Sequence, residues 1–369
     1  MKVLFTATVV KSHINTFHLP FLKMFKDEGW GTAVAARNDF EIPSDCVIPN
    51  CDTYFDITFE RNPFNPKNIR AYRQLKKVID KGNYDIIHCH TPVGGLLTRL
   101  AAVSARRRGT KVYYTAHGFH FYKGAPMKNW LLYYPVERLL AHLTDVLITI
   151  NKEDYNRAKK FRAGKIVYVP GVGIDTAKFK ASDDERREIR NKLRTELGIP
   201  LDAPVLLSVG EVNENKNHKI AIEALPQLDG VWYVICGRGP LMETHRKLAE
   251  KLGVSERLIM PGFRNDVADF YKMADAFVFP SFREGLPVSL MEALASGLPA
   301  VCTKIRGSAD LVREGENGFY APAEDPLGFA TAIKTVLNAQ VKRSLPGIYD
   351  VHSVQIRMKR IYGIGMVSR

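Results

Sequence analysis

Two carboxylates, Glu284 and Glu292, stand eight positions apart around a predicted helix start. The apolar run 274–280 has the length of a strand, and Pro287 suits a first helical residue because its missing N–H costs nothing there. The helix should end at Gly297, a natural left-handed cap. Such a strand, turn and helix directs free N–H groups and a positive dipole end out of a sheet edge, where a phosphate can bind. The two glutamates are too far apart to share a proton, so we expect them to hold two parts of one long ligand.

Apolar runs of strand length alternate with helical stretches along the chain. This alternation predicts a parallel, doubly wound α/β sheet in each half of the chain. A charged stretch at 183–196 is expected to form a solvated helix before the strands of the second sheet. We therefore expect two Rossmann-like domains, residues 1–172 and 173–352, with a C-terminal helix in 353–369 that packs back on the first. The expected strands are 3–10, 31–36, 84–88, 111–116, 145–150 and 166–169, then 205–209, 231–236, 257–260, 276–279 and 300–302.

Polar residues come after the first expected strand of each half. Lys11, Ser12 and His13 follow the expected strand 3–10, and the stretch 210–218 follows the expected strand 205–209. Ligands of doubly wound sheets bind at the carboxyl ends of the strands. Two such crevices, one on each domain, predict a ligand held between them.

The chain has 369 residues, of which 46% are hydrophobic, which is enough for two cored domains. No window reaches the roughly 18 to 20 uncharged apolar residues of a membrane-spanning helix, and residues 3–10 are expected to form a strand rather than a signal peptide. Five scattered cysteines without C-x-x-C spacing argue against a disulfide framework or a structural zinc site. We expect a cytoplasmic protein.

The basic charge is concentrated in the first half of the chain. Residues 1–172 carry 26 Lys plus Arg against 14 Asp plus Glu, whereas residues 173–369 carry 27 against 25. A half with a net charge of +12 should attract nucleic acid, an anionic membrane surface or a phosphorylated acceptor. A soluble basic surface is the plain alternative.

These residues resemble the GT-B glycosyltransferases of family four, which are retaining enzymes that use nucleotide-activated sugars. The resemblance covers most of the chain and is nearest to the bacterial capsular and exopolysaccharide enzymes. It implies two Rossmann-like domains that face each other across a cleft. The motifs that carry it are the E-x7-E of Glu284 and Glu292, Lys216 in Gly-Glu-Val-Asn-Glu-Asn-Lys-Asn-His, Gly237-Arg238-Gly239-Pro240, Pro261-Gly262-Phe263 before Asp266-Val267, and His117-Gly118 after Tyr-Thr-Ala.

Physical chemistry gives these residues matching roles. A departing nucleoside diphosphate needs a cation and oriented amides, which Lys216 and the helix start can supply. The resemblance implies that Glu292 accepts from the ribose hydroxyls and that Glu284 and His117 contact the donor sugar. The implied catalytic residues are His117, Lys216 and Glu284. The implied donor contacts are Gly210, Asn215, Gly237, Gly239, Arg264, Gly285, Leu286, Pro287, Val288 and Glu292, and the acceptor side holds Lys11, Ser12 and His13.

Several of these assignments have plain alternatives. The Gly-x-Gly sequence at Gly237 and Gly239 also fits a plain tight turn that contacts no nucleotide. Arg264 also fits a surface arginine. Many relatives place an arginine where this chain has Glu211, so Arg238 or Arg283 would have to complete the phosphate clamp. His88, His90, His117 and His120 fall on different expected loops without ligand spacing, which argues against a metal site.

The segment 126–143 is rich in aromatic and leucine residues with interspersed basic residues. It predicts either an interfacial helix on anionic lipid or a buried core helix. The basic cluster 106–108 could contact lipid headgroups or a lipid diphosphate. With the basic domain, this favours a peripheral protein on the inner face of the cell membrane.

The resemblance implies a hexosyltransferase or N-acetylhexosaminyltransferase that needs no cofactor or metal. Its donor would be a nucleotide sugar, for which UDP is preferred, and its acceptor an undecaprenyl-diphosphate-linked saccharide in exopolysaccharide synthesis. The first half shows no obvious carboxylate at a strand end to form a covalent intermediate, and the resemblance implies front-face substitution. The rivals are a nucleotide-sugar epimerase, a nucleic-acid-binding protein, for which we find no motif, and a nicotinamide dehydrogenase, which lacks the full glycine fingerprint.

Overall fold

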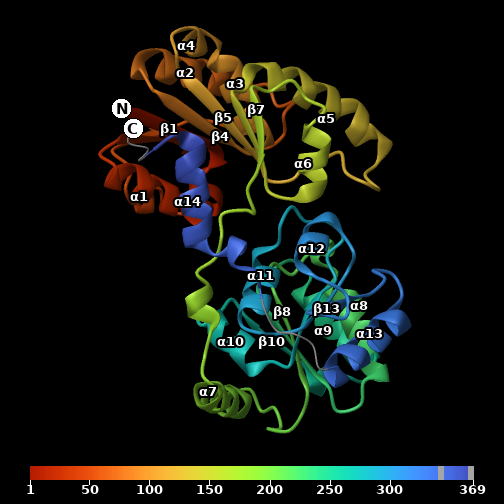
Figure 1. Cartoon of the computed structure of the whole chain (residues 1–369). Coiled ribbons are helices and arrows are strands. Elements are labelled where there is room, and N and C mark those ends of the chain that lie inside the picture. The colour runs from red at the N-terminus through yellow and green to blue at the C-terminus, as the bar shows by residue number, and fades with distance from the viewer. Residues whose placement is uncertain (340–344, 365–369) are drawn as a thin grey trace. The chain divides into compact units, whose positions relative to one another are not determined.

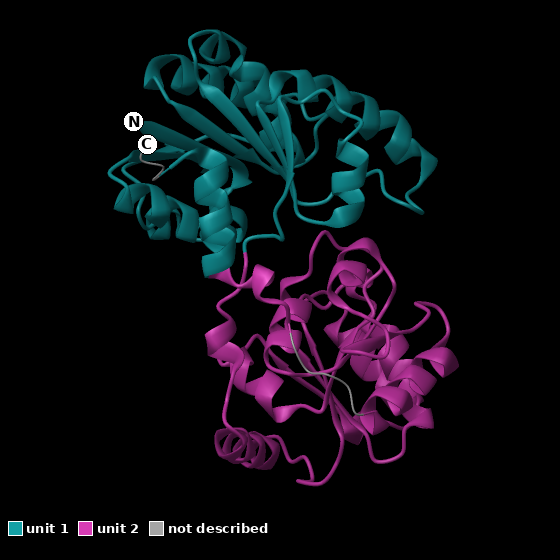
Figure 2. Cartoon of the chain, in the orientation of Figure 1, with its two compact units in different colours: residues 1–172, 352–369 teal, residues 173–351 magenta. Residues whose placement is uncertain are grey.

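The computed structural model describes residues 1–339 and 345–364, which form two compact α/β units (Figures 1 and 2). Unit 1 comprises residues 1–172 and 352–369, and unit 2 comprises residues 173–351. The chain therefore returns to unit 1 at its C-terminal end, through helix α14, Val351–Tyr362. Residues 365–369 of the helix expected at 353–369 lie outside the described residues.

Unit 1 is built on a parallel sheet of seven strands within the described residues, in the order β3-β2-β1-β4-β5-β6-β7. Every pairing in it is parallel, so each strand is followed by a crossover. The strands are β1 Lys2–Val9, β2 Gly31–Arg37, β3 Thr53–Asp56, β4 Ile86–His90, β5 Lys111–Ala116, β6 Val146–Thr149 and β7 Lys165–Tyr168.

Helices cover both faces of this sheet, because alternate residues of each buried strand point to opposite sides. In β4, Ile87 packs in the core shared with α2, α3, α5 and α6, whereas Ile86 packs in the core shared with α1 and α14. The helices are α1 Leu19–Asp27, α2 Lys67–Gly82, α3 Pro92–Ala101, α4 Val103–Arg107, α5 Met127–Leu140 and α6 Lys152–Ala158, with a π-helix η1 at Val10–Asn15 and short 3-10 turns η2 Pro43–Asp45 and η3 Ala141–Leu143.

Unit 2 repeats the arrangement with a parallel sheet of six strands among its described residues, in the order β10-β9-β8-β11-β12-β13. Helices α8, α9 and α13 share a core on one face. Helices α10 and α11 contact the strands as well, and α7 packs against α10. The strands are β8 Val205–Val209, β9 Trp232–Cys236, β10 Leu258–Gly262, β11 Ala276–Phe279, β12 Ala300–Cys302 and β13 Gly318–Tyr320.

The helices of unit 2 vary from six to fourteen residues. Ser182 caps the longest of them, α7, by accepting from the Glu185 amide. The helices are α7 Asp183–Glu196, α8 His218–Ala224, α9 Met242–Lys251, α10 Val267–Met273, α11 Val288–Ala295, α12 Arg306–Leu311 and α13 Pro326–Asn338, with 3-10 turns η4 Thr176–Phe179, η5 Glu214–Lys216, η6 Leu225–Gln227, η7 Ser255–Arg257 and η8 Gly347–Tyr349.

The predicted fold class, two Rossmann-like doubly wound domains, is confirmed. Two strands were not predicted, β3 and β13, which are short and only partly buried. The expected strand 84–88 lies two residues later, at 86–90, which places His90 at the end of the strand. No helix of the described residues has both the length and the apolar character needed to cross a bilayer.

Helix α5 is neither wholly buried nor wholly exposed. Trp130, Tyr133 and Tyr134 pack against the core of unit 1. Leu131 and Leu139 are 71% and 70% exposed. The helix thus packs with its aromatic residues and presents leucines to the solvent.

Candidate active site

Each sheet changes direction at its first strand. The chain moves outward from β1 through β2 to β3, then returns to place β4 on the other side of β1, and unit 2 does the same around β8 with β11. Doubly wound sheets bind ligands beside the loops that follow two such neighbouring strands. Most of the predicted site residues follow β1, β5, β8 or β11, while Gly237 and Gly239 follow β9, Arg264 follows β10, and Glu292 lies within α11.

In unit 2 the loops after β8 and β11 are joined by an ion pair. Lys216 Nζ lies 2.7 Å from Glu284 Oε1. Asn215 Nδ2 donates to the Arg283 carbonyl at 2.9 Å and to Glu284 Oε1 at 3.4 Å. The structure thus brings the neighbouring residues Asn215 and Lys216 to Glu284, which lies 69 and 68 positions further along the chain.

Local turns fix the direction of Lys216. Asn213 caps the 3-10 turn η5 by accepting from the Lys216 amide, and Asn217 adopts a left-handed conformation with φ of 51°. The Asn217 side chain donates to the carbonyls of Pro280 and Ala323. Lys216 Nζ also lies 5.3 Å from the centre of the Phe279 ring. The ammonium group is therefore held at the carboxyl edge of the sheet, with 20% of its side chain exposed.

The predicted helix start after β11 is present, with one correction. Pro287 is the cap of α11 rather than its first helical residue, and Val288 takes that place. A proline side chain cannot accept a hydrogen bond, and the first intrahelical bond runs from Met291 N to the Pro287 carbonyl. The amides of residues 288–290 therefore have no acceptor within the helix and are open to an anion. Gly297 ends the helix with φ of 81°, as predicted.

Glu292 lies in the second turn of α11 and is held by a tyrosine. Its Oε2 accepts from the Tyr271 hydroxyl at 2.9 Å, and the same hydroxyl contacts the Ser289 carbonyl at 3.1 Å. Burial raises the pKa of the Glu292 carboxyl, while the Tyr271 hydrogen bond opposes that shift. Sequence reasoning missed Tyr271, which comes from α10 and has no motif of its own.

The predicted glycines serve backbone packing. A Cβ at Gly237 would lie 1.8 Å from the Gly210 carbonyl oxygen, and one at Gly239 would lie 2.2 Å from the Val212 carbonyl oxygen. Gly210 and Gly237 also have φ of 151° and 158°. These glycines are therefore explained by the close approach of two loops, without requiring contact with a nucleotide.

The arginines near the site divide into paired and unpaired groups. Arg264 forms two hydrogen bonds with Asp266, at 2.8 and 2.7 Å, and a third contact with Glu196, so its charge is already neutralised. Arg238 and Arg283 are exposed and make no ion pair among the described residues. Arg306, which sequence reasoning missed, donates from Nε to the Glu284 carbonyl at 2.8 Å.

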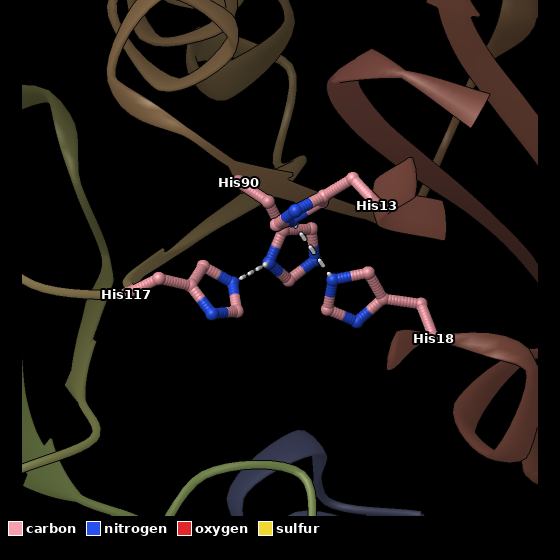
Figure 3. Close-up of side chains that lie close together, drawn as sticks. All are labelled: His13, His18, His90 and His117. Atoms are coloured by element: carbon pink, nitrogen blue, oxygen red, sulfur yellow. Dashed lines mark hydrogen bonds between the residues drawn. The ribbon is translucent and has the colours of Figure 1, made fainter. Parts of the chain in front are cut away.

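In unit 1 the corresponding edge holds a cluster of four histidines, His13, His18, His90 and His117 (Figure 3). They come from η1, the residue before α1, the end of β4 and the residue after β5. One ring nitrogen from each histidine can be chosen so that all four lie within 4.8 Å of one another. In the sequence, the separate loops of His90 and His117 argue against a cluster of histidines. That expectation is wrong, because the ends of parallel strands meet at one edge of the sheet. His120 is not in the cluster and stacks on Tyr133.

The cluster is made of neutral imidazoles. Burial lowers the pKa of His117 to about 4 and that of His88, which lies beside the cluster, to about 3. Burial also holds the pKa of His18 and His90 well below the usual value, and the neighbouring histidines add to the effect. Ring nitrogens of His18 and His13 lie 3.2 Å apart, and those of His90 and His117 lie 3.3 Å apart, which are hydrogen-bond distances. These contacts occupy one nitrogen of each ring, while His18 Nδ1 and His90 Nε2 are buried without a hydrogen-bond partner among the described residues.

The predicted acceptor-side residues Lys11 and Ser12 belong to η1, the segment that also carries His13 of this cluster. Lys11 and Ser12 are exposed. Their amides donate to the Asp39 carboxylate at 2.5 and 3.1 Å, and Ser12 Oγ donates to it at 2.6 Å. His13 comes directly after them and joins the cluster, so Asp39 fixes the loop that carries all three residues.

Both units match families of known proteins. Residues 23–178 match "Glycosyltransferase Family 4", and residues 189–347 match "Glycosyl transferases group 1". The Bacillus subtilis (strain 168) protein named "Putative glycosyltransferase EpsD" is 46% identical, over 97% of both chains. An Escherichia coli protein named "UDP-Gal:alpha-D-GlcNAc-diphosphoundecaprenol alpha-1,3-galactosyltransferase" is 30% identical, over 88% of this chain and 83% of that protein. The solved structure of Anabaena Alr3699/HepE in complex with UDP and glucose has the same fold, with a TM-score of 0.79, 20% identity and coverage of 98% and 99%.

The histidine cluster should make stability fall in mild acid. A histidine with a lowered pKa stays neutral in the folded protein, while in the unfolded chain it takes up a proton below a pH of about 6.5. Each such histidine therefore costs up to about 1.4 kcal/mol of unfolding free energy per pH unit as the pH falls from about 6.5 towards 4. Urea denaturation at pH 7.5 and 5.5 measures the loss. His90→Gln should reduce the pH dependence, and the exposed control His142→Gln should not. Equal pH dependence in both variants would contradict the assignment.

Proposed function

The chain belongs to the family 4 glycosyltransferases, and from this premise we propose that it moves a sugar from a UDP-linked donor to a lipid-linked saccharide in cell-surface polysaccharide synthesis. The proposed reaction retains the anomeric configuration and uses no metal ion. Family membership sets aside the epimerase, the dehydrogenase and the nucleic-acid-binding protein as alternatives.

One observation carries the proposal for the donor. Lys216 and Glu284 form an ion pair beside an uncapped helix start, and Glu292 lies one turn further along that helix. An ammonium group and free amides suit a diphosphate, because both face the negative charge that grows as the nucleotide departs. A carboxylate suits the two adjacent hydroxyls of a ribose, since both can donate to it. We therefore assign the nucleotide sugar to unit 2, with Glu292 at the ribose and Glu284 at the sugar.

The phosphate clamp is incomplete with Lys216 alone. Glu211 is exposed and stands where an arginine was expected. Arg238 and Arg283 remain as proposed clamp residues because neither is paired among the described residues. Arg264 is a poor candidate for contact with the nucleobase, because it would have to give up its hydrogen bonds to Asp266.

The residues of unit 1 suit a front-face substitution. The group of potential ligand side chains at its strand ends holds four histidines and, among the described residues, no carboxylate that could attack an anomeric carbon. Without a covalent intermediate, the departing phosphate takes the proton of the acceptor hydroxyl, and the enzyme positions the reactants. A neutral His117 can donate to a sugar hydroxyl from one ring nitrogen while its other nitrogen contacts His90.

The acceptor assignment draws on a relative. The Escherichia coli protein that is 30% identical carries in its name a diphosphoundecaprenol-linked sugar as acceptor. By similarity we assign a lipid-linked saccharide to unit 1, with Lys11, Ser12 and His13 beside it. The basic excess of residues 1–172 agrees with a phosphorylated acceptor.

A peripheral position on the inner face of the cell membrane is proposed from the character of α5. Its exposed leucines lie on the same helix as Lys128 and Arg138. Exposed apolar side chains with basic neighbours suit the interface of an anionic membrane.

Nucleotide binding is tested by thermal shift with UDP, GDP and ADP. UDP at one hundred times its Kd should stabilise the protein by about 2.7 kcal/mol, because it binds only the folded state. Glu292→Gln should weaken UDP binding about tenfold, since it removes a charged acceptor. The control Glu188→Gln changes an exposed glutamate on α7 and should leave binding intact. No shift with any of the three nucleotides would count against the function.

Lys216→Ala should lower the turnover number by a factor on the order of 100 or more, because the departing diphosphate loses its cation. Sugar transfer is measured with a panel of UDP-sugars and lipid-linked acceptors in the presence of EDTA. Lys219→Ala is the matched control, since Lys219 lies three residues away with its side chain 62% exposed. An unchanged rate would remove Lys216 from the mechanism, and loss of wild-type activity in EDTA would contradict metal independence.

Liposome flotation tests the membrane position. Wild-type protein should float with vesicles that contain phosphatidylglycerol and less with neutral phosphatidylcholine vesicles, because lipid charge adds to apolar insertion. The double variant Leu131→Glu/Leu139→Glu should lose most of this binding. Leu201→Glu, which changes a leucine of unit 2 that is 51% exposed, should keep it. Equal and negligible binding to both vesicles would refute the membrane role.

A further inference from the structure

Unit 1 contains a cavity of about 610 Å³ that the donor site does not use. It lies between the loop after β1, the segment 61–64, the start of α3 and the helix α5. Its volume is within the range of about 300 to 1,000 Å³ that is typical of pockets for small ligands. The lining includes Ser12 and His13, so the cavity adjoins both the acceptor-side loop and the histidine cluster.

Much of the cavity lining is apolar, and part of it is exposed to solvent. Val93 and Leu96 of α3 line it, and Leu132 and Val136 of α5 line it as well. Leu132 and Val136 are 49% and 40% exposed, and Phe64 at the same cavity is 74% exposed. Apolar groups that are exposed and concave together indicate a binding site for an apolar ligand.

The apolar lining continues onto the surface of α5. Leu132 and Val136 line the cavity, while Leu131 and Leu139 of the same helix are exposed and do not line it. A long apolar chain could thus enter the cavity with one end and leave over the leucines of α5 with the other.

The cavity lining also includes groups that suit an anion. Arg61 lines it, is exposed, and makes no ion pair or hydrogen bond with any described residue. Thr91, the cap residue of α3, uses its side-chain oxygen on Thr8 and the His90 carbonyl, so it does not cap the helix. The amide of Val93, a residue that lines the cavity, therefore has no acceptor from the cap side chain.

Among the described residues, Glu137 is the carboxylate that lines the cavity, and its charge is already paired. Glu137 is paired with Arg99 at 2.9 Å, and its other oxygen accepts from the Tyr114 hydroxyl at 3.2 Å. Arg99 is fully buried beneath it. The negative charge of Glu137 is thus neutralised from below, and Arg61 remains the unpaired charge at the cavity.

We propose that this cavity binds the part of a lipid diphosphate where the diphosphate meets its apolar chain. Arg61 and the start of α3 face the diphosphate, and Phe64, Leu132 and Val136 contact the first units of the chain. The inference rests on the proposed function and deepens it, since it says which residues select a lipid carrier. The cavity adjoins His13, so a sugar on the diphosphate would reach the histidine cluster.

The test uses three probes on the full chain: farnesyl diphosphate, farnesol and inorganic diphosphate. Binding is measured by isothermal titration and by the shift of the melting temperature. Farnesyl diphosphate should bind more tightly than either of the others, because only it offers both the apolar chain and the charge. Stronger binding of inorganic diphosphate would indicate a free-phosphate site and overturn the lipid assignment.

Two substitutions separate the parts of the cavity. Val136→Trp should fill the apolar side and weaken farnesyl diphosphate about tenfold, and the milder Val136→Phe should act in the same direction. Arg61→Glu should weaken farnesyl diphosphate about tenfold and leave farnesol unchanged. The matched control Ile69→Trp adds the same ring to a β-branched residue of α2 that is 58% exposed and does not line the cavity, so it should bind like the wild type. Equal binding to Val136→Trp and Ile69→Trp would refute the proposal.

UDP binding keeps the two proposals distinguishable. If UDP stabilises the wild type and farnesyl diphosphate does not bind, the lipid cavity is refuted and the transferase stands. If UDP does not bind either, the proposed function fails. Melting temperatures without ligand show whether each variant is folded.

Discussion

The site depends on the meeting of loops at the carboxyl ends of parallel strands. A doubly wound sheet places its first and fourth strands side by side and sends the loops after them to the same edge. In unit 2 this brings Lys216, after β8, to Glu284, after β11, at 2.7 Å. In unit 1 the same topology brings His13, after β1, to His90, at the end of β4. The chemistry of each unit is thus set by the side chains on the loops after those two strands.

The two edges differ in charge for a physical reason. The edge of unit 2 carries a paired ammonium group and free amides, which suit the growing charge of a departing diphosphate. The edge of unit 1 carries buried imidazoles whose pKa values are too low for a positive charge at neutral pH. Neutral rings can exchange hydrogen bonds with sugar hydroxyls and do not compete for the phosphate. A charged cluster would cost desolvation energy and repel itself.

Sequence patterns predicted those parts that depend on local order. The helix expected at 183–196 has the observed bounds of α7, since a serine cap and three acidic residues mark its start. Glu284, Glu292 and Lys216 could be proposed from the sequence because they stand in short motifs, and the structure places Lys216 beside Glu284. Tyr271 and Arg306 were not found, because they reach Glu292 and Glu284 only through the packing of α10 and α12. The histidine cluster was missed for the same reason, since each member belongs to a different loop.

The helix α5 shows how a buried charge can support an exposed apolar surface. Arg99 is buried and pairs with Glu137, and its guanidinium lies 3.9 Å from the centre of the Tyr114 ring. Breaking such a pair leaves an uncompensated buried charge, which costs about 3 to 5 kcal/mol, so the pair fixes α5 on the sheet. Trp130 and Tyr134 add apolar packing on the same side. Because these contacts hold the helix from below, its outer leucines, Leu131 and Leu139, remain largely exposed to solvent.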